Sequence, residues 1–449
     1  MARQLFGTDG VRGRAGEFLT AELALSLARA AVALRTVGGA ASDNGRPQVL
    51  IVRDTRESGE MLEAAIAAGV TAAGGDALVA GVLPTPAAPL LVRRHGLALA
   101  AVISASHNPY ADNGVKLFAA DGFKLADDDE HRIEAELDQP PAAPERIGRV
   151  RTLHGALEDY LRELHTRFAG LDLRGRRVLL DCANGATYRA APEIFRRLGA
   201  HVDVLADQPD GRNINDGCGS THLEWLIEAM RRGDHDLAFA FDGDGDRVLA
   251  VDRDGVVVDG DELVAMAALH LRRLGRLGGG VAVTVMTNYG FHTAMRDAEI
   301  EVATTAVGDR YVLDELRRRG WALGGEQSGH IIELGFGPSG DGIASALLTL
   351  EALGDRDLAA RETMHRLPQR LVNIRGENRA ALTAALESEP VREAIARAGE
   401  GLSGRGRVLV RASGTEPLIR VMVEAPTERE TDDVCTELAR VVESALGAG

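Results

Sequence analysis

The sequence predicts an α/β protein with three α/β units followed by a smaller α+β domain. Two observations indicate this class. Short apolar runs with strand character alternate with amphipathic stretches of helical periodicity over most of the chain. After Pro368 the pattern changes to closely spaced strands and helices. With 449 residues the chain is long enough to form several domains.

Turn signals and shifts in composition mark the domain boundaries. The Pro/Ala-rich segment Asp138–Pro144 predicts a linker. A new α/β unit follows it, a third opens near Asp259, and the pattern changes near Pro368. We therefore expect four domains, at residues 1–150, 151–256, 257–368 and 369–449.

The elements are expected in a regular order. Expected strands lie at residues 49–52, 97–103, 177–181, 236–241, 248–251, 281–284, 406–410 and 419–424. Expected helices lie at 58–73, from about 154, and at 261–274, 343–353, 379–387 and 427–446. Ser58 is the expected N-cap of the first helix, and 115–124 is an expected hairpin. The strand–helix alternation predicts parallel sheets in the first three units.

The composition excludes several classes of protein. With 51 basic and 67 acidic residues the formal net charge is −16, which argues against general nucleic-acid binding. The three cysteines are widely separated, which favours a reducing compartment and thus a cytoplasmic protein. Because there is no apolar N-terminal segment and no long apolar span, we expect neither export nor membrane insertion.

The densest chemical pattern is the acidic loop Asp242-Gly-Asp-Gly-Asp-Arg247. Alternate side chains of a straight strand lie about 6.6 Å apart, whereas Mg²⁺ holds its ligands at about 2.1 Å. The three aspartates can therefore share a cation only if the backbone curls, which Gly243 and Gly245 allow. The preceding strand would place this loop at a carboxyl end, where α/β sheets bind ligands. The alternative is an acidic surface turn. An EF-hand is excluded because Arg247 and Arg253 occupy its glycine and bidentate-acid positions.

A serine turn, Ser104-Ala-Ser-His-Asn-Pro109, ends an apolar run. Ser106 adjoins the turn residues, so we expect it, rather than Ser104, to be the presented hydroxyl. A hydroxyl together with an acidic clamp for a hard cation indicates phosphoryl chemistry, with serine carrying the phosphate and Mg²⁺ holding it. No Gly-x-Ser-x-Gly elbow surrounds Ser106, which disfavours a serine hydrolase.

Two more polar loops are candidate binding sites. Gly324–His330 combines a carboxylate, an amide, a hydroxyl and an imidazole, which can recognise sugar hydroxyls. Arg411–Arg420 offers two arginines, two hydroxyls and the backbone of Gly414, which can hold a phosphate. Either loop could instead be a solvated turn.

Two cations lie near the serine turn or at the start of the chain. Glycines flank Arg12 in Phe6–Gly13, which suggests an arginine that reaches a crowded site. The alternative is a flexible terminus. The apolar residues Phe6 and Val11 argue against that alternative, because both favour burial. Lys116 closely follows the serine turn. It is either a surface residue or, beside a phosphate, a proton shuttle or charge stabiliser.

Taken together, the serine turn, the acidic loop, the Gly-Glu-Gln-Ser-Gly-His loop and the Arg-Ala-Ser-Gly-Thr-Glu-Pro loop resemble the α-D-phosphohexomutase superfamily, in the family's order. The resemblance spans essentially the whole chain. It implies four domains around a central cleft: three related α/β units with mixed sheets and a smaller C-terminal α+β domain. It also implies that the phosphorylated Ser106 gives its phosphoryl group to a sugar phosphate and takes back the other one from a bisphosphate intermediate.

The resemblance implies a role for each motif residue. One Mg²⁺ per chain would be held by Ser106, Asp242, Asp244 and Asp246. Arg12, Arg247 and Lys116 would offset negative charge, and Lys116 would be the proton shuttle, with His107 and His330 as alternatives. The sugar would be held by Glu326 and Ser328, and the phosphate that does not react by Arg411, Ser413, Gly414, Thr415 and Arg420.

Further motifs resemble the subgroup that acts on an amino sugar: Phe6–Gly13, Asn213–Asn215, Cys218–His222 and Gln327. This resemblance implies interconversion of glucosamine 6-phosphate and glucosamine 1-phosphate through glucosamine 1,6-bisphosphate, feeding UDP-N-acetylglucosamine and peptidoglycan synthesis. The alternative function is that of a phosphomannomutase/phosphoglucomutase, which usually has Met at the position of Gln327. A separate alternative for Gln327 is that it shapes its loop without contacting the substrate. A non-catalytic sugar-phosphate sensor is disfavoured because the motifs are intact. We expect a monomer or homodimer.

Overall fold

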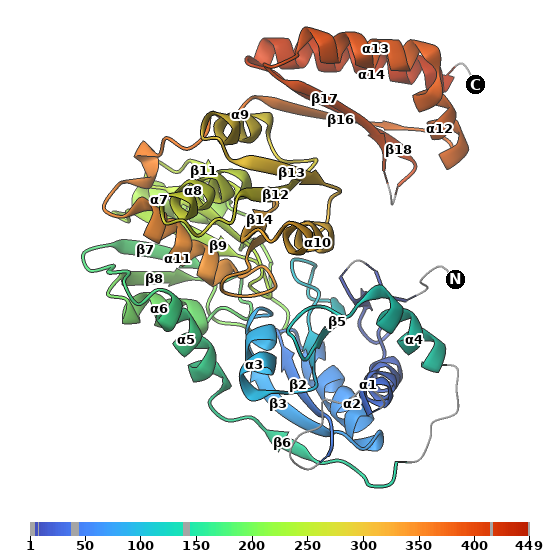
Figure 1. Cartoon of the computed structure of the whole chain (residues 1–449), viewed down its shortest axis with the longest axis vertical. Helices are drawn as coiled ribbons and strands as arrows, with labels where there is room; N and C mark the ends of the chain where they lie inside the picture. Colours follow the sequence, from blue (N-terminus) through green and yellow to red (C-terminus); the bar gives the residue numbers. More distant parts are fainter. Residues whose placement is uncertain (1–4, 8, 37–44, 138–143, 414–415, 448–449) are drawn as a thin grey trace. The chain divides into compact units, whose positions relative to one another are not determined.

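The computed structural model describes residues 5–7, 9–36, 45–137, 144–413 and 416–447. The chain forms two compact units. The first consists of Met1–Val285 and Ala303–Arg361, and the second of Met286–Val302 and Glu362–Gly449. Figure 1 shows the labelled elements of both units.

The first sheet has six strands in the order β1-β5-β4-β2-β3-β6. Its strands are β1 (Val11–Arg14), β2 (Gln48–Arg53), β3 (Asp76–Val82), β4 (Leu99–Ile103), β5 (Asp112–Ala119) and β6 (Val150–Thr152). Strand β2 runs parallel to β3 and β4, whereas β5 runs antiparallel to β4 and β1. The accompanying helices are α1 (Ala21–Thr36), α2 (Ser58–Ala72), α3 (Ala87–His95) and α4 (Asp127–Leu137).

Alternation along β2 explains why helices cover both faces of this sheet. Val49 and Ile51 belong to the apolar core formed with α1 and α2. Leu50 and Val52, which must point to the opposite face, are buried as well, and α3 contacts β2 and β4. A strand that is apolar on both faces is typical of a sheet between helical layers.

The second sheet, of five strands in the order β11-β10-β9-β7-β8, carries the acidic loop. Its strands are β7 (Arg177–Asp181), β8 (His201–Leu205), β9 (Leu237–Phe241), β10 (Val248–Asp252) and β11 (Val257–Val258). Strand β7 is parallel to β8 and β9, but β10 returns antiparallel to β9. Its helices are α5 (Ala156–Arg167), α6 (Ala190–Arg197) and α7 (Glu224–Arg232).

The third sheet has four strands in the order β13-β12-β14-β15. Its strands are β12 (Gly280–Thr284), β13 (Glu301–Thr305), β14 (Leu323–Gly325) and β15 (Ile331–Glu333). Strand β14 is parallel to β12 and antiparallel to β15. Its helices are α8 (Gly260–Arg273), α10 (Asp309–Arg319) and α11 (Gly342–Leu353), followed by the short 3-10 helix η1 (Leu358–Ala360). Both α8 and α11 also contact β10 of the second sheet, so these two sheets share one packed interior.

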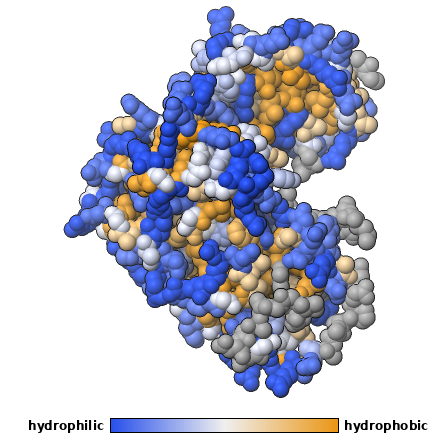
Figure 2. All heavy atoms as spheres, viewed as in Figure 1, coloured by the Kyte–Doolittle hydropathy of each residue, from blue (hydrophilic) through white to orange (hydrophobic). Residues whose placement is uncertain are grey.

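The second unit is built on an antiparallel sheet of three strands in the order β16-β18-β17. Its elements are β16 (Gln369–Arg375), β17 (Arg407–Ala412), β18 (Leu418–Glu424), α9 (Tyr289–Asp297), α12 (Arg379–Glu387), α13 (Glu389–Gly401) and α14 (Glu428–Gly447). Residues of α12, α13 and α14 form one apolar core with β16 and β18. Figure 2 shows that apolar side chains also reach the surface of this unit.

The predicted class, three α/β units with mixed sheets and a smaller α+β domain, is confirmed. The expectation of wholly parallel sheets is wrong. Strands β9 and β10 are joined by a six-residue loop, Asp242–Arg247, and a connection that short can only join antiparallel neighbours. Ser58 is also not the N-cap: it is the first residue of α2, and Glu57 precedes it without a side-chain cap. Among the described residues, no helix is both long and apolar enough to cross a membrane.

Candidate active site

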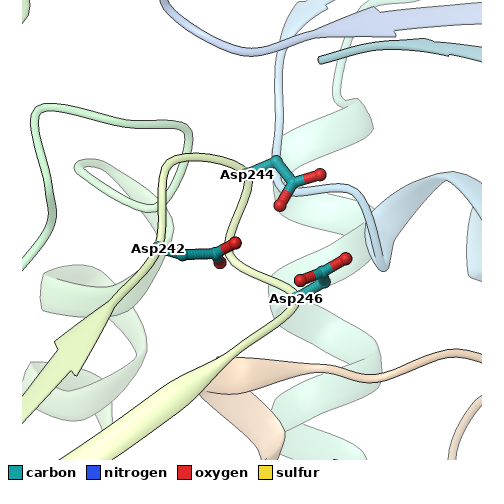
Figure 3. A group of neighbouring side chains, drawn as sticks. All are labelled: Asp242, Asp244 and Asp246. Atoms are coloured by element: carbon teal, nitrogen blue, oxygen red, sulfur yellow. The ribbon is translucent and has the colours of Figure 1, made fainter. Parts of the chain in front are cut away.

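The acidic loop curls as its glycines predict and brings three carboxylates together. Asp242, Asp244 and Asp246 each offer a ligand atom, and these atoms lie within 4.8 Å of one another. Figure 3 shows the three side chains on one curled loop between two strands. Gly245 has a φ of +75°, in the left-handed region, and a Cβ on Gly243 would lie 2.6 Å from the carbonyl oxygen of Ser106. Glycine is therefore required at both positions, for conformation at one and for close approach at the other.

These carboxylates fit a hard divalent cation. All three residues are buried, with exposed fractions of 1%, 1% and 5% for Asp242, Asp244 and Asp246. One oxygen of Asp244 and one of Asp246 have no hydrogen-bond partner in the part of the chain that the structure describes. Burial, together with Asp246 and Asp244, raises the pKa of Asp242 well above its usual range. Three buried carboxylates, two of which have an oxygen without a partner, are the kind of donor set that Mg²⁺ prefers.

The serine turn places one hydroxyl directly against this cluster. Ser106 follows β4, is buried, and has a φ of 53°. Its Oγ donates to Asp242 Oδ2 at 2.5 Å and lies 3.2 Å from Nδ1 of His107. Ser104 instead donates to Asp54 at 2.6 Å. Of the two serines, only Ser106 presents its hydroxyl to the acidic loop. Burial and the charges of Arg247 and Arg12 lower the pKa of His107 to about 4.

Lys116 also contacts the acidic loop. It projects from β5, which pairs with the strand that leads into the serine turn. Its Nζ is 2.9 Å from Asp244, 3.4 Å from Asp246 and 3.1 Å from Asp9, and the side chain is 1% exposed. Burial acts to lower the pKa of Lys116, but Asp244 and Asp246 outweigh it and the net effect is a raised pKa. The sequence alternative of a surface lysine is thereby wrong.

The loop Gly324–His330 meets the acidic loop through backbone and side chain. Arg247 and His330 form an isolated antiparallel bridge. His330 Nδ1 lies 3.6 Å from Asp246, and its Nε2 lies 3.7 Å from Asp309. The backbone N–H of Arg247 donates to Asp242 at 3.2 Å. The side chain of Arg247 is 26% exposed, and its Nε lies 3.9 Å from Asp246. Both side chains thus lie beside the carboxylate cluster.

The sugar-loop candidates differ in what they touch. Glu326 is half-buried and Ser328 is exposed. Burial raises the pKa of Glu326, against the opposing charge of His330. The amide of Gln327 donates to Asp259 Oδ2 at 3.3 Å. That contact favours the alternative in which Gln327 shapes its loop rather than contacting a sugar.

Arg12 is joined to the cluster through residues that the sequence did not single out. It lies on β1, pairs with Asp9, and its Nη1 is 3.5 Å from the carbonyl oxygen of Ala105. Asp9 also contacts Lys124, whose Nζ lies 2.5 Å from Asp309. Arg12, Asp9, Lys124 and Asp309 therefore form a row of alternating positive and negative charges beside the acidic loop. These residues come from distant segments and meet only in the folded chain.

The second unit holds the predicted phosphate loop. Arg411 on β17 stands opposite Arg420 on β18, and Ser413 follows at the end of β17. Like charges directly opposite each other destabilise a sheet unless an anion compensates them. Nε of Arg420 is buried and has no hydrogen-bond partner within the described ranges. Gly414 and Thr415, the remaining predicted members, lie outside the described residues.

Three further side chains support the site. None of them was given a role there from the sequence, although Asn213–Asn215 was named as a subgroup motif. Thr85 donates to Asp244 at 2.7 Å. Arg56, which is fully buried, and Asn215 both donate to backbone carbonyls of the serine turn. The density of polar residues in Arg53-Asp-Thr-Arg56, directly after a predicted strand, was the one available signal for Arg56.

Comparison with known proteins gives the class. The four domains described for phosphoglucomutase/phosphomannomutase all match in order. Alpha/beta/alpha domain I matches residues 3–143, domain II 158–255, domain III 259–371, and the C-terminal domain 371–441. A solved phosphoglucomutase/phosphomannomutase family protein from Burkholderia thailandensis has the same fold, with a TM-score of 0.82 at 22% identity over 98% of this chain and 97% of that one. The chain belongs to the phosphoglucomutase/phosphomannomutase family.

Within this family the chain is similar to phosphoglucosamine mutases along its whole length. The one from Desulforudis audaxviator is 49% identical over 98% of this chain and 97% of its own. The one from Pseudomonas aeruginosa strain UCBPP-PA14 is 47% identical over 98% and 99%. The chain is accordingly an enzyme, an isomerase of the phosphohexomutase type.

Proposed function

We propose that the protein interconverts glucosamine 6-phosphate and glucosamine 1-phosphate, with Ser106 as the carrier of the phosphoryl group and glucosamine 1,6-bisphosphate as the intermediate. The observation that carries this proposal is the contact between Ser106 Oγ and Asp242 at 2.5 Å, in a cluster of three buried carboxylates. The identity of 46–49% to phosphoglucosamine mutases supports the amino sugar as substrate. The product would feed the synthesis of UDP-N-acetylglucosamine and peptidoglycan.

The chemistry requires alignment and charge neutralisation more than covalent help. In the forward step the P–O bond to Ser106 Oγ breaks, a P–O bond to the sugar hydroxyl forms, and the hydroxyl proton leaves to a base. The bisphosphate then reorients and its other phosphoryl group returns to Ser106. Asp242, Asp244, Asp246 and the serine oxygen would hold Mg²⁺, which when bound neutralises phosphoryl oxygens.

The cations of the chain have distinct places in this proposal. Lys116, with its contacts to Asp244 and Asp246, offsets charge beside the reacting group. Arg12 and Arg247 flank the cluster and would do the same. The proton transfer is assigned to Lys116, with His107 and His330 as the alternative bases, since both lie beside the cluster or the serine. The raised pKa of Lys116 favours its charged form, so it must first give up its own proton, whereas the lowered pKa of His107 keeps that ring neutral and able to accept one.

Substrate binding would be divided between two loops. Glu326 and Ser328 would hold the sugar. Arg411, Ser413, Gly414, Thr415 and Arg420 would hold the phosphate that does not react; the facing arginines and the free Nε of Arg420 support this assignment. We also keep, as part of this proposal, the division of the chain into four domains with boundaries near residues 150, 256 and 368.

We also place the protein in the cytoplasm as a monomer or homodimer. The support for a reducing compartment is that Cys182, Cys218 and Cys435 are buried free thiols. Burial raises the pKa of the Cys182 thiol well above its usual range and that of Cys218 to about 12, so these thiols are inert rather than reactive.

The substrate assignment is tested by comparing kcat/KM for glucosamine 6-phosphate with values for mannose and glucose phosphates. We expect a clear preference for the amino sugar. A preference for a neutral sugar would instead establish the phosphomannomutase/phosphoglucomutase alternative. Absence of turnover on every sugar phosphate, with bisphosphate supplied, would overturn the enzymatic proposal.

A further inference from the structure

Two backbone carbonyls of the serine turn converge on two side-chain nitrogens. Arg56 Nη2 donates to the carbonyl oxygen of Ser106 at 2.9 Å and to that of Asn108 at 2.8 Å. Asn215 Nδ2 donates to the same two oxygens, at 2.9 and 3.1 Å. Each nitrogen carries two hydrogens and each carbonyl oxygen has two lone pairs. The four hydrogen bonds therefore use both hydrogens of each nitrogen and both lone pairs of each carbonyl oxygen, while Oδ1 of Asn215 is buried without a partner among the described residues.

Arg56 is itself held in place within a buried network. Its Nε pairs with Asp54 Oδ2 at 2.9 Å, its Nη1 donates to the carbonyl of Pro109, and the residue is 0% exposed. The same Asp54 oxygen accepts from Ser104 Oγ at 2.6 Å, and that hydroxyl accepts the N–H of Ser106 at 2.9 Å. The beginning and the end of the turn are thus tied to one ion pair.

This arrangement holds a conformation that the turn would not adopt by itself. Ser106 has a φ of 53°, a left-handed value that is uncommon for a residue other than glycine and costs of order 1 kcal/mol or more. The carbonyls of Ser106 and Asn108 approach common donors, so their dipoles would repel each other without them. With the backbone fixed in this way, Ser106 Oγ lies 2.5 Å from Asp242.

We propose that Arg56 and Asn215 are positioning residues, which together clamp the serine turn so that Ser106 is aligned for phosphoryl transfer. The proposal rests on the proposed function. Arg56 is a buried cation that follows β2 of the first sheet, and Asn215 comes from the segment between β8 and α7 of the second sheet. The clamp therefore joins the segments around two sheets of the first unit. A displacement of about 1 Å in a reacting group can lower a rate about 10²-fold, so neither residue needs to touch the substrate.

Two substitutions test the clamp. Asn215→Asp keeps the size of the side chain but replaces its N–H donors with an oxygen that faces two carbonyls. Arg56→Lys keeps the charge but not the fork that spans Asp54 and the carbonyls. Arg167→Lys is the matched control: Arg167 has an 8% exposed side chain and pairs with Glu333 at 2.9 Å and Glu351 at 3.2 Å, away from the turn. The measurements are kcat and KM for glucosamine 6-phosphate, the ³¹P resonance of the phosphoserine, and the thermal midpoint.

Under conditions in which each protein is folded, we expect both clamp variants to lose about 10² in kcat with little change in KM. We expect the ³¹P resonance to shift in both. The control should lose thermal stability and keep the parent's kcat and ³¹P resonance. Because Arg56 is fully buried, Arg56→Lys can fail to fold, and Asn215→Asp then decides.

The clamp proposal would be overturned if folded variants kept the parent's kcat and ³¹P resonance. It would also be overturned if the loss of kcat were fully explained by the fraction of the variant that is unfolded. A parent protein without phosphoserine and without turnover would overturn the proposed function instead. In that case hydrogen exchange across residues 104–109 still decides on the clamp, because it should accelerate in Asn215→Asp and remain unchanged in Arg167→Lys.

Discussion

The serine turn and the β17–β18 hairpin are both assigned to phosphate, but they are built differently. The carbonyls of Ser106 and Asn108 are fully paired, and the Ser106 hydroxyl already has its partner in Asp242. In the hairpin, Arg411 faces Arg420, and Nε of Arg420 is buried without a hydrogen-bond partner among the residues described. The backbone carbonyls of the serine turn thus have their partners within the protein, whereas the hairpin keeps a buried donor without a partner among the residues described.

This difference matches the two tasks of a mutase. The reacting phosphoryl group needs a fixed position, which a rigid and fully hydrogen-bonded turn provides. The other phosphate needs attraction, which two facing arginines can provide with bidentate geometry. Changes near the serine turn should therefore act mainly on kcat, and changes in the hairpin mainly on KM.

The largest effect is expected from Asp244→Asn. Asp244 has one oxygen without a hydrogen-bond partner in the described chain, and its other oxygen contacts Lys116 and Thr85. The change removes a charge from the cation site, so calorimetry should show weaker Mg²⁺ binding and kcat should fall about 10²-fold or more. Asp203→Asn, on an exposed carboxylate paired with His235, is the control. Parent-like Mg²⁺ affinity in Asp244→Asn would refute the metal assignment.

A smaller effect, on the other side of the comparison, is expected from Arg420→Ala. Loss of a charge-assisted hydrogen bond to phosphate is worth about 1.5–3 kcal/mol, which corresponds to a rise of roughly tenfold or more in KM, with kcat less affected. Arg370→Ala is the control, since Arg370 on β16 pairs with Asp432 and is 42% exposed. If Arg420→Ala lowered kcat while leaving KM unchanged, the contrast between the two regions would fail.

The smallest effect concerns the support of the acidic loop. Asp341 caps α11, accepts Tyr160 Oη at 3.0 and 2.9 Å, and is followed by Gly342, whose N–H donates to Gly245 at 2.9 Å. Burial raises the pKa of Asp341 from 3.8 to about 7. The folded protein thus favours the protonated form of Asp341. The free energy of unfolding receives the full contribution of this group at low pH, and the contribution is lost as the pH rises from 3.8 toward 7, because the unfolded chain ionises first.

Asp341→Asn, which stays neutral, should not lose that contribution. The difference in thermal midpoint, variant minus parent, should increase between pH 5 and pH 8. Parallel pH dependences in the two proteins would show that Asp341 does not titrate in this range.

Local sequence patterns predicted much of the fold but few of the contacts between residues that are distant in the sequence. The strand 237–241 and the curled loop after it follow from neighbouring residues, so the sequence placed both. The antiparallel return of β10 could have been predicted from the length of its loop. The role of Arg56 and Asn215 at the serine turn could not have been assigned, because the carbonyls that they bind lie 50 to 109 residues away in the sequence and meet them only after folding.

The central claim, that Ser106 carries the transferred phosphoryl group, is tested most directly by single-turnover transfer. The enzyme is first phosphorylated with ³²P-labelled bisphosphate, the labelled peptide is mapped, and glucosamine 6-phosphate is then added. We expect label on Ser106, its transfer to the sugar, and neither label nor turnover in Ser106→Ala. Label on Ser104 instead, or turnover in Ser106→Ala at the parent rate, would contradict it.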